Sequence, residues 1–522
     1  MKQLLCITMG IKKMLFEEKS TSYLFFSDFL FKDKFNRKLI LLWLVAIVVK
    51  IFIFKYFYPN VAFINGDSYA YLRSAYLNLK VDLYPIGYSR FLRLVSVFST
   101  SDFVLFILQY LLCQIACLLA VFSLFYFYVR LRITQVLLVL LLMISPLELY
   151  MSNYVSSDSL FLALSIFWIT SLVWLINRFS LFLIVVHSFL LLLVFMVRYN
   201  ALFYPFVSVV AFVIMRGRLW LKVVGIAAGF LLIGGFVEKT SEQYARETGV
   251  RQFSPFSGWQ LANNGIYTYY FIDSAHRKDL PPKFKKLDMM VRGYFDTTHF
   301  LMTNYPEQML DISAQFMWDN KSPLRKYMKK EFEGDSLTTE LVGWSKMAPL
   351  YGEYGKALIK TYPGAFIKRY IWPNLIRYYV PPVEFLSNYG YRADTVIDIG
   401  KRWFDYKSNK LETRFKNKSV GILNYYPIIS GVLNAVFVMM SISFFLLNGV
   451  SIDRVLFKFW LLIVGFWICN MLFSVFASPI ALRFQSFPIL LCFFADFLLL
   501  DFMLVQEKYK GKEIEGALIE AI

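Results

Sequence analysis

Four charged side chains border apolar runs of this sequence: two acids and two arginines. Asp67 lies in NGDSYAYL, shortly after the run LILLWLVAIVVKIFIFKYFY, and Asp158 lies in SSDSLFLAL, where another run starts. Arg198 follows FMV directly, and Arg483 lies in ALRFQSFPIL. A pair of carboxylates can supply a base and an orienting group, or hold a divalent ion, and a guanidinium suits a phosphate. On one face of a fold, the four would allow proton transfer beside a bound phosphate.

Each of these residues also has a purely structural interpretation. NGDS is a good helix-capping or turn sequence, and an acid such as Asp158 complements the dipole at a helix start. Arginines at the end of a span can extend to the lipid interface. The combination of two acids and two cations favours chemistry over these separate explanations.

The elements that hold these residues are membrane spans. Of the 522 residues, 58% are hydrophobic and 19% aromatic, and the mean hydropathy is +0.53. Soluble proteins are roughly 45–50% apolar, and several runs here reach the about 20 residues that cross a bilayer. The sequence therefore predicts an all-α, multi-pass integral membrane protein rather than a soluble one.

The expected topology follows from the apolar runs and from the basic residues between them. About ten spans are predicted, over residues 39–57, 103–129, 133–150, 159–176, 180–197, 201–215, 221–237, 422–447, 457–476 and 485–505. Lysines and arginines fill the short loops on one side, which the positive-inside rule assigns to the cytoplasm. The divisions expected are a cytoplasmic segment 1–38, spans within 39–237 with external loops 58–102 and 150–158, an external domain 238–421, spans within 422–505 and a cytoplasmic tail 506–522. Counting the spans that precede each of the four charged residues places all of them on the external face.

The hydrophilic stretch 238–421 is expected to be a mainly helical external domain. Its aromatic segments, such as YPGAFIKRYIWPNLIRYYVPP, fit a domain core with an interfacial belt, or a platform that meets an acceptor, and Pro373 is expected to limit a continuous helix there. The formal net charge of +19 suits anionic headgroups. Nucleic acid is not expected as a partner, because no basic, aromatic-interleaved soluble domain stands apart from the spans.

The order of the motifs resembles the type-C membrane glycosyltransferases (GT-C). DSYAYL, YPIGYSRFL, SSDSLFLAL, RYNALFYP and a late RFQSFPIL follow one another, and the chain looks most like the group with protein O-mannosyltransferases and aminoarabinose-to-lipid A transferases. The resemblance covers residues 39–215 and, loosely, the last spans. It implies an inverting transferase using a polyprenyl-phosphate sugar, with Asp67 as base and Asp158 as the second-loop acid. It also implies a bacterial inner membrane with a periplasmic domain, although an endoplasmic-reticulum membrane presents the same face outward.

The chain departs from the family pattern at two positions. Ser68 stands where the family often has a second acid, so metal dependence stays open, with Asp67 and Asp158 as the candidate ligands of a divalent ion. Tyr84 stands where some members have a lysine, so Arg73 or Lys80 can take over phosphate binding. The residues expected to contact the phosphate or sugar of the donor are Arg73, Lys80, Tyr84, Tyr88, Arg198, Tyr199 and Arg483.

Other functions stay open beside the transferase. A transporter or flippase for a lipid-linked saccharide predicts ionisable residues within spans and internal repeats. A polysaccharide ligase or polymerase would release polyprenyl diphosphate rather than monophosphate. A scaffold without activity leaves Asp67 and Arg483 unexplained. The expected function is transfer of a sugar from a polyprenyl-phosphate donor to a hydroxyl of a glycan, lipid or protein acceptor.

Overall fold

The computed structural model describes residues 23–304, 315–335, 338–414 and 419–520. Across these ranges the regular structure is helical, and only isolated bridges, not strands, pair extended backbone. Seven of the described helices are long and apolar enough to cross a membrane. They are α3 (Lys34–Phe57), α6 (Asp102–Phe127), α9 (Ser157–Asn177), α12 (Leu219–Thr248), α22 (Tyr426–Leu446), α24 (Arg454–Ala477) and α25 (Leu482–Glu520). The prediction of an all-helical, multi-pass membrane architecture is confirmed at this level.

Three further apolar segments form shorter helices. They are α7 (Arg132–Ile144), α10 (Leu181–Val197) and the pair η1 (Tyr199–Phe203) and α11 (Tyr204–Ile214). Each coincides with one of the predicted spans, but the predicted helix over 133–150 is interrupted. The helix ends at Ile144, with Ser145 as its C-cap, since Pro146 offers no N–H to continue it, and α8 (Leu147–Ser152) follows.

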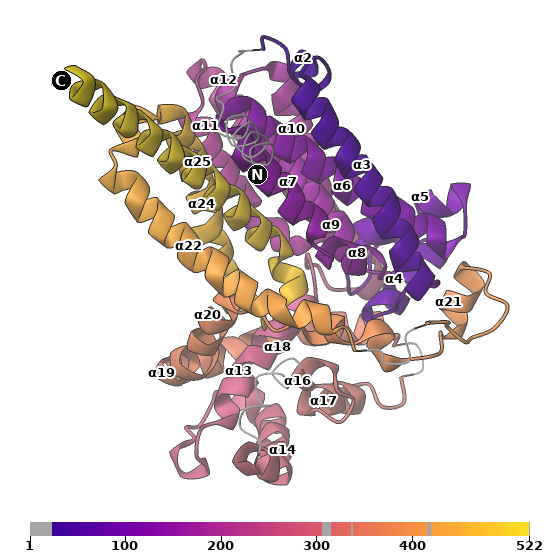
Figure 1. Cartoon of the computed structure of the whole chain (residues 1–522). Coiled ribbons are helices and arrows are strands. Elements are labelled where there is room, and N and C mark those ends of the chain that lie inside the picture. The colour runs from indigo at the N-terminus through magenta and orange to yellow at the C-terminus, as the bar shows by residue number, and fades with distance from the viewer. Residues whose placement is uncertain (1–22, 305–314, 336–337, 415–418, 521–522) are drawn as a thin grey trace.

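The long helices form one bundle, and the elements from α13 to α19 gather at one end of it (Figure 1). There α13 (Phe256–Tyr270) packs along α18 (Glu340–Thr361) around a second hydrophobic core that includes Trp259 and Trp344. Helix α12 runs without a break through residue 237, where the external domain was expected to begin. The chain therefore leaves the membrane bundle as a helix that continues to Thr248, and the non-helical residues 249–255 connect it to α13 and the second core.

The amphipathic segment that contains Pro373 is helical from end to end. It consists of α19 (Pro363–Phe366), the π turn η5 (Ile367–Ile371) and α20 (Trp372–Tyr379). Pro373 was expected to limit a continuous helix. Pro373 lies instead in the first turn of α20, directly after the π turn. A proline without an N–H is tolerated there, because the hydrogen-bond pattern changes from π to α at this point.

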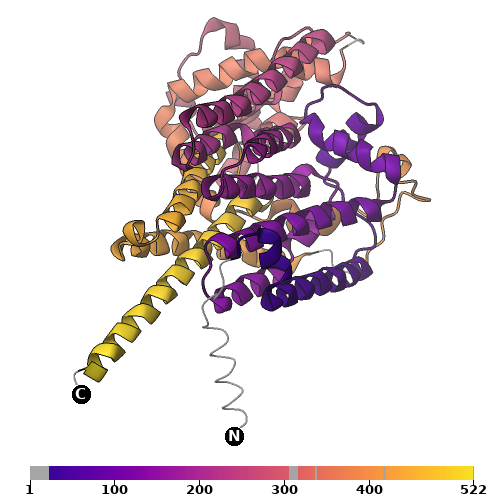
Figure 2. The same ribbon diagram turned by 90° about the horizontal axis from the view of Figure 1, so that it is seen from above.

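The first loop after α3 contains two short helices, α4 (Asp67–Tyr76) and α5 (Ile86–Phe98), which pack on each other. From above, they lie at the side of the bundle opposite the far end of α25, which extends beyond the other helices (Figure 2). Helix α4 starts at Asp67, so the loop delivers this acid to the end of the bundle where the second core also lies.

Candidate active site

Asp67 is the first residue of α4, and both of its carboxylate oxygens bind side chains. Gly66 precedes it with φ of 93°, a left-handed backbone conformation that glycine adopts without strain. Oδ1 accepts from the hydroxyl of Tyr84 at 2.9 Å, and Oδ2 accepts from the Arg483 guanidinium at 3.0 Å. The side chain is 23% exposed. Within the described part of the chain Asp67 makes no capping hydrogen bond, and its two oxygens instead bind two different partners in a side chain that is partly exposed.

Asp158 lies in the first turn of α9 and is buried, with 4% of its side chain exposed. One oxygen is paired with Arg198, and the other accepts from the Ser156 hydroxyl at 2.9 Å and from Arg483 at 3.4 Å. The Ser156 hydroxyl also accepts from the backbone N–H of Asp158. The same side chain therefore caps α9 and orients the Asp158 carboxylate. The position at a helix start was expected from the sequence, and the paired arginines supply the cations that a buried carboxylate needs.

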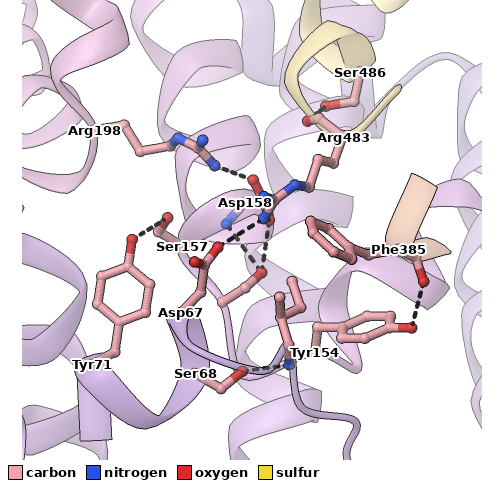
Figure 3. A network of polar contacts seen from close by, with 12 residues as sticks. Asp67, Ser68, Tyr71, Tyr154, Ser157, Asp158, Arg198, Phe385, Arg483 and Ser486 are labelled. Carbon is pink, nitrogen blue, oxygen red and sulfur yellow. Dashed lines mark hydrogen bonds and ion pairs between the residues drawn. The ribbon is translucent and has the colours of Figure 1, made fainter. Parts of the chain in front are cut away.

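Arg483, in the first turn of α25, joins the two acids (Figure 3). Its side chain is 10% exposed, and its guanidinium lies over the rings of Phe385 and Phe484 at 4.9 and 4.5 Å from their centroids. Arg198 lies over the same Phe484 ring at 4.6 Å. The two cations thus share one aromatic wall, which holds them close despite their like charges.

One donor of Arg483 is unused. Its Nε is buried and has no hydrogen-bond partner among the described residues. A buried guanidinium N–H without an acceptor is costly, so an incoming oxyanion that accepts from it would gain more than at an exposed arginine. The atom is covered in this structure, so a phosphate would reach it only when the packing around Arg483 opens.

Phe385 belongs to a segment that the sequence motifs did not include. The segment is η6 (Glu384–Ser387), and it is held by Tyr154, whose hydroxyl donates to the carbonyl of Asn388 at 3.2 Å. Tyr154 stands a few residues before Asp158, in the same loop. No local signal distinguishes Phe385 from the many other phenylalanines, because its role comes from the tertiary contact with Arg483.

Tyr84 is the only one of the three predicted tyrosines that touches an acid. Burial and the neighbouring Asp67 carboxylate raise the pKa of Tyr84 well above its usual value, so its hydroxyl stays a donor. Tyr88 is buried and donates instead to Gln109 at 2.8 Å. The ring of Tyr199 packs against Phe253, with centroids 4.4 Å apart. Tyr88 and Tyr199 therefore support the walls around the site without contacting the acids.

Arg73 and Lys80, the expected substitutes for the missing lysine, lie away from the acids. Arg73 is bound to Asp82, with nitrogen–oxygen distances of 3.2 and 3.4 Å, and Lys80 is exposed. Asp82, which the sequence did not single out, is 2% exposed. It also accepts from Ser74 and from the backbone N–H of Leu83. Asp82 therefore anchors the loop that presents Tyr84 to Asp67.

The residues present do not fit a metal site well. Asp67 and Asp158 are the carboxylates that pair with the two arginines in the described ion pairs, and the Arg483 guanidinium contacts both of them. No cluster of three potential ligands occurs among the described residues. A divalent ion would have to compete with a cation that is already bound to both acids, and we derive no step through a metal.

Gly87 of YPIGYSRFL allows α5 to touch the end of α10. A Cβ at this position would collide with the carbonyl of Met196 and come within 2.8 Å of the nitrogen of Val197, next to Arg198. We expect Gly87→Ala to lower the free energy of unfolding by about 1–3 kcal/mol and to displace Arg198. Thermal unfolding in detergent checks this, with Gly293→Ala, where nothing lies within 4 Å, as the control. Equal melting temperatures for the two variants would contradict the packing argument.

Comparisons with known proteins return no match: no family model fits the chain, and no curated protein or solved structure is significantly similar. The likeness to type-C glycosyltransferases therefore stays a prediction from short motifs. The motifs that suggested it are separated in sequence but contribute Asp67, Asp158, Arg198 and Arg483 to one connected network.

Proposed function

We propose that the chain is an inverting membrane glycosyltransferase that moves a sugar from a polyprenyl-phosphate donor to a hydroxyl acceptor, as in the type-C group it resembles. The observation that supports this best is the network in which a partly exposed acid, Asp67, pairs with Arg483, which also contacts Asp158 and is linked through it to Arg198 (Figure 3). A base placed beside a cationic pocket is what attack on a phosphate-activated sugar requires.

The donor phosphate would bind at Arg483 and Arg198. A phosphate oxygen can accept from the unused Nε of Arg483 and compete with Asp67 for the rest of the guanidinium. Such competition would loosen the pair between Asp67 and Arg483 when donor binds, and so make the carboxylate a better base. Asp158 contacts both arginines and would hold them in place.

In the chemical step, Asp67 takes the proton of the acceptor hydroxyl while the acceptor oxygen forms a bond to the anomeric carbon. The bond from that carbon to the phosphate oxygen breaks, and its electron pair leaves with polyprenyl phosphate. Attack opposite the phosphate inverts the anomeric centre. The guanidinium groups stabilise the charge that develops on the phosphate, and the protonated Asp67, which is 23% exposed, returns its proton to water.

The topology that accompanies this proposal has ten spans, with the site and residues 238–421 on the external, periplasmic face of a bacterial inner membrane. The 13 residues of α7 cover only about 20 Å at 1.5 Å per residue, less than the roughly 30 Å hydrocarbon core. Crossing at this point would need α8 as a continuation. The 17 residues of α10 cover about 26 Å and come closer to a full span.

The test uses the purified protein in liposomes with radiolabelled polyprenyl-phosphate sugars and a set of hydroxyl acceptors. We expect release of polyprenyl monophosphate and an inverted anomeric configuration in the product, read by nuclear magnetic resonance. Retention of configuration would contradict the direct displacement by an acceptor. A requirement for a diphosphate-linked glycan would instead identify a ligase or polymerase.

One observation favours the second candidate, a transporter for a lipid-linked saccharide. Asp496 lies within α25, is 5% exposed, and neither of its carboxylate oxygens has a hydrogen-bond partner among the described residues. Ionisable groups inside spans mark transport pathways. Thirteen positions, or about 20 Å of helix, separate it from Arg483, so it plays no part in the proposed chemistry.

Asp496→Asn separates the two functions. If the protein is a transferase, we expect this variant to keep the wild-type rate of sugar transfer, because the changed group is remote from the acids. Transfer is measured with radiolabelled donor, and translocation with a fluorescent lipid-linked sugar that is quenched from outside the liposome. Loss of translocation in this variant, with no sugar transfer by the wild type, would establish the transporter.

A further inference from the structure

A tryptophan at the edge of the second core contacts the tyrosine that binds Asp67. Trp318 ends the short helix α16 (Gln315–Trp318), and its ring lies parallel to that of Tyr84, with an interplanar angle of 5° and centroids 6.0 Å apart. Tyr84 in turn donates to Oδ1 of Asp67. A continuous set of contacts therefore links α16 to the proposed base.

Trp318 differs from the tryptophans behind it in being exposed. Trp259 and Trp344 are stacked with centroids 3.9 Å apart and are fully buried, whereas Trp318 is 39% exposed. Trp344, at 5.2 Å, and Phe256, at 5.9 Å, support the Trp318 ring from the core. The indole is thus a rigid surface with part of its area open to a ligand.

The two carboxylate oxygens of Asp67 have different neighbours, which define two sides of the site. Oδ2 faces Arg483, and through it Asp158 and Arg198, which is the cationic side. Oδ1 faces Tyr84, beyond which Trp318 lies, and no cation contacts this oxygen in the described part of the chain. A phosphate would be drawn to the first side, so the second side is left for the molecule that gives up a proton.

We propose that Trp318 forms the acceptor subsite and that the acceptor is a saccharide. A pyranose would place its C–H face on the open indole surface while one of its hydroxyl groups donates to Oδ1 of Asp67. An aromatic ring supplies a large, rigid apolar surface beside a polar group, which is what a sugar with one apolar face and several hydroxyls needs. The identity of the subsite as an acceptor site rests on the function proposed above, but the binding of a pyranoside does not.

The binding experiment needs no donor. Diazirine-bearing glucopyranoside, mannopyranoside and N-acetylglucosaminide are photolysed with the protein in nanodiscs, in competition with the parent methyl glycosides, and the labelled residues are found by mass spectrometry. We expect competed labelling on residues of α16 and the Tyr84 loop, lowered about tenfold by Trp318→Ala and less by Trp318→Phe, which keeps a ring. Trp372→Ala is the matched control, because Trp372 is 60% exposed and lies in α20.

The kinetic experiment tests the acceptor role. With radiolabelled polyprenyl-phosphate sugar, we expect Trp318→Ala to raise the KM for an octyl pyranoside acceptor about tenfold, with a much smaller change in kcat. Slow hydrolysis of the donor by water, without acceptor, should fall by a much smaller factor than transfer to the pyranoside. A structural defect would lower both by similar factors, and the melting temperature of each variant checks the fold.

The outcomes separate this inference from the proposed function. Competed labelling that depends on Trp318, in a protein that transfers no sugar, would support the pyranoside site and refute the transferase. Transfer with an unchanged KM and unchanged labelling in Trp318→Ala would overturn the inference while leaving the transferase. The inference would also be overturned if none of the three pyranosides gave competed labelling. Transfer to a peptide hydroxyl at the same rate by the wild type and by Trp318→Ala would overturn it as well.

Discussion

Asp67→Asn is expected to lower the rate of sugar transfer by about 10²–10⁴-fold. Asparagine keeps the size of the side chain and can still accept from Tyr84, but its amide cannot take the proton of the acceptor. The loss should therefore appear in kcat, while the donor still binds through Arg198 and Arg483. Single-turnover transfer from radiolabelled donor, together with donor binding to the same preparation, measures both quantities.

Asp102→Asn is the matched control for this experiment. Asp102 also begins a helix, α6, and also accepts from a tyrosine, Tyr406, at 2.7 Å. It contacts neither arginine of the site in any described ion pair. We expect this variant to keep the transfer rate, with at most a lower melting temperature. Full activity in Asp67→Asn would remove the base from the proposal.

Arg483→Ala is expected to affect both folding and activity, because one guanidinium connects both acids. Its removal leaves Asp158, which is 4% exposed, with Arg198 as its remaining cation. Breaking a buried pair in this way costs about 3–5 kcal/mol, which thermal unfolding in detergent measures. Loss of the proposed phosphate site should lower kcat/KM by about 10²–10³-fold, as for other groups that stabilise a developing oxyanion.

Two further variants separate the causes of that loss. Arg483→Lys keeps a charge but loses the separate Nε donor and the planar group that lies over Phe385 and Phe484, so it should recover stability more than activity. Arg130→Ala removes an arginine whose ion pair with Asp453 is 45% exposed on the arginine side, and it should cost at most about 1 kcal/mol. Binding of labelled polyprenyl phosphate, the leaving group, is expected to fall most for Arg483→Ala, less for Arg483→Lys, and not for Arg130→Ala. Unchanged binding would place the phosphate elsewhere.

Several features of this protein follow from local sequence. The length of the apolar runs predicts the helices, because a segment that must satisfy its own backbone in hydrocarbon has few alternatives to a helix. The same argument indicates which residues stand at helix ends, and so brings Asp67, Asp158, Arg198 and Arg483 to notice. The helix predicted over 133–150 is too long, because Pro146 interrupts it.

The partners of individual side chains were not available from local sequence. Arg73 and Arg483 are both basic residues near the external loops, but Arg73 pairs with Asp82 and Arg483 joins Asp67 to Asp158. Tyr84 and Tyr88 are neighbours in one motif, yet only Tyr84 reaches an acid. Each choice depends on the rotation of a helix about its axis and on what packs against it.

By itself, the sequence determined that the chain is a helical membrane protein with acids and arginines at the ends of its apolar segments. Composition and run length decide this, because they set the free energy of each segment in lipid regardless of its neighbours. Only the tertiary structure decided that Arg483 lies between two acids, that Phe385 covers it, and that Trp318 stacks beside Tyr84. These contacts join residues 98 to 416 positions apart in the sequence, and they exist only where packed helices bring side chains together.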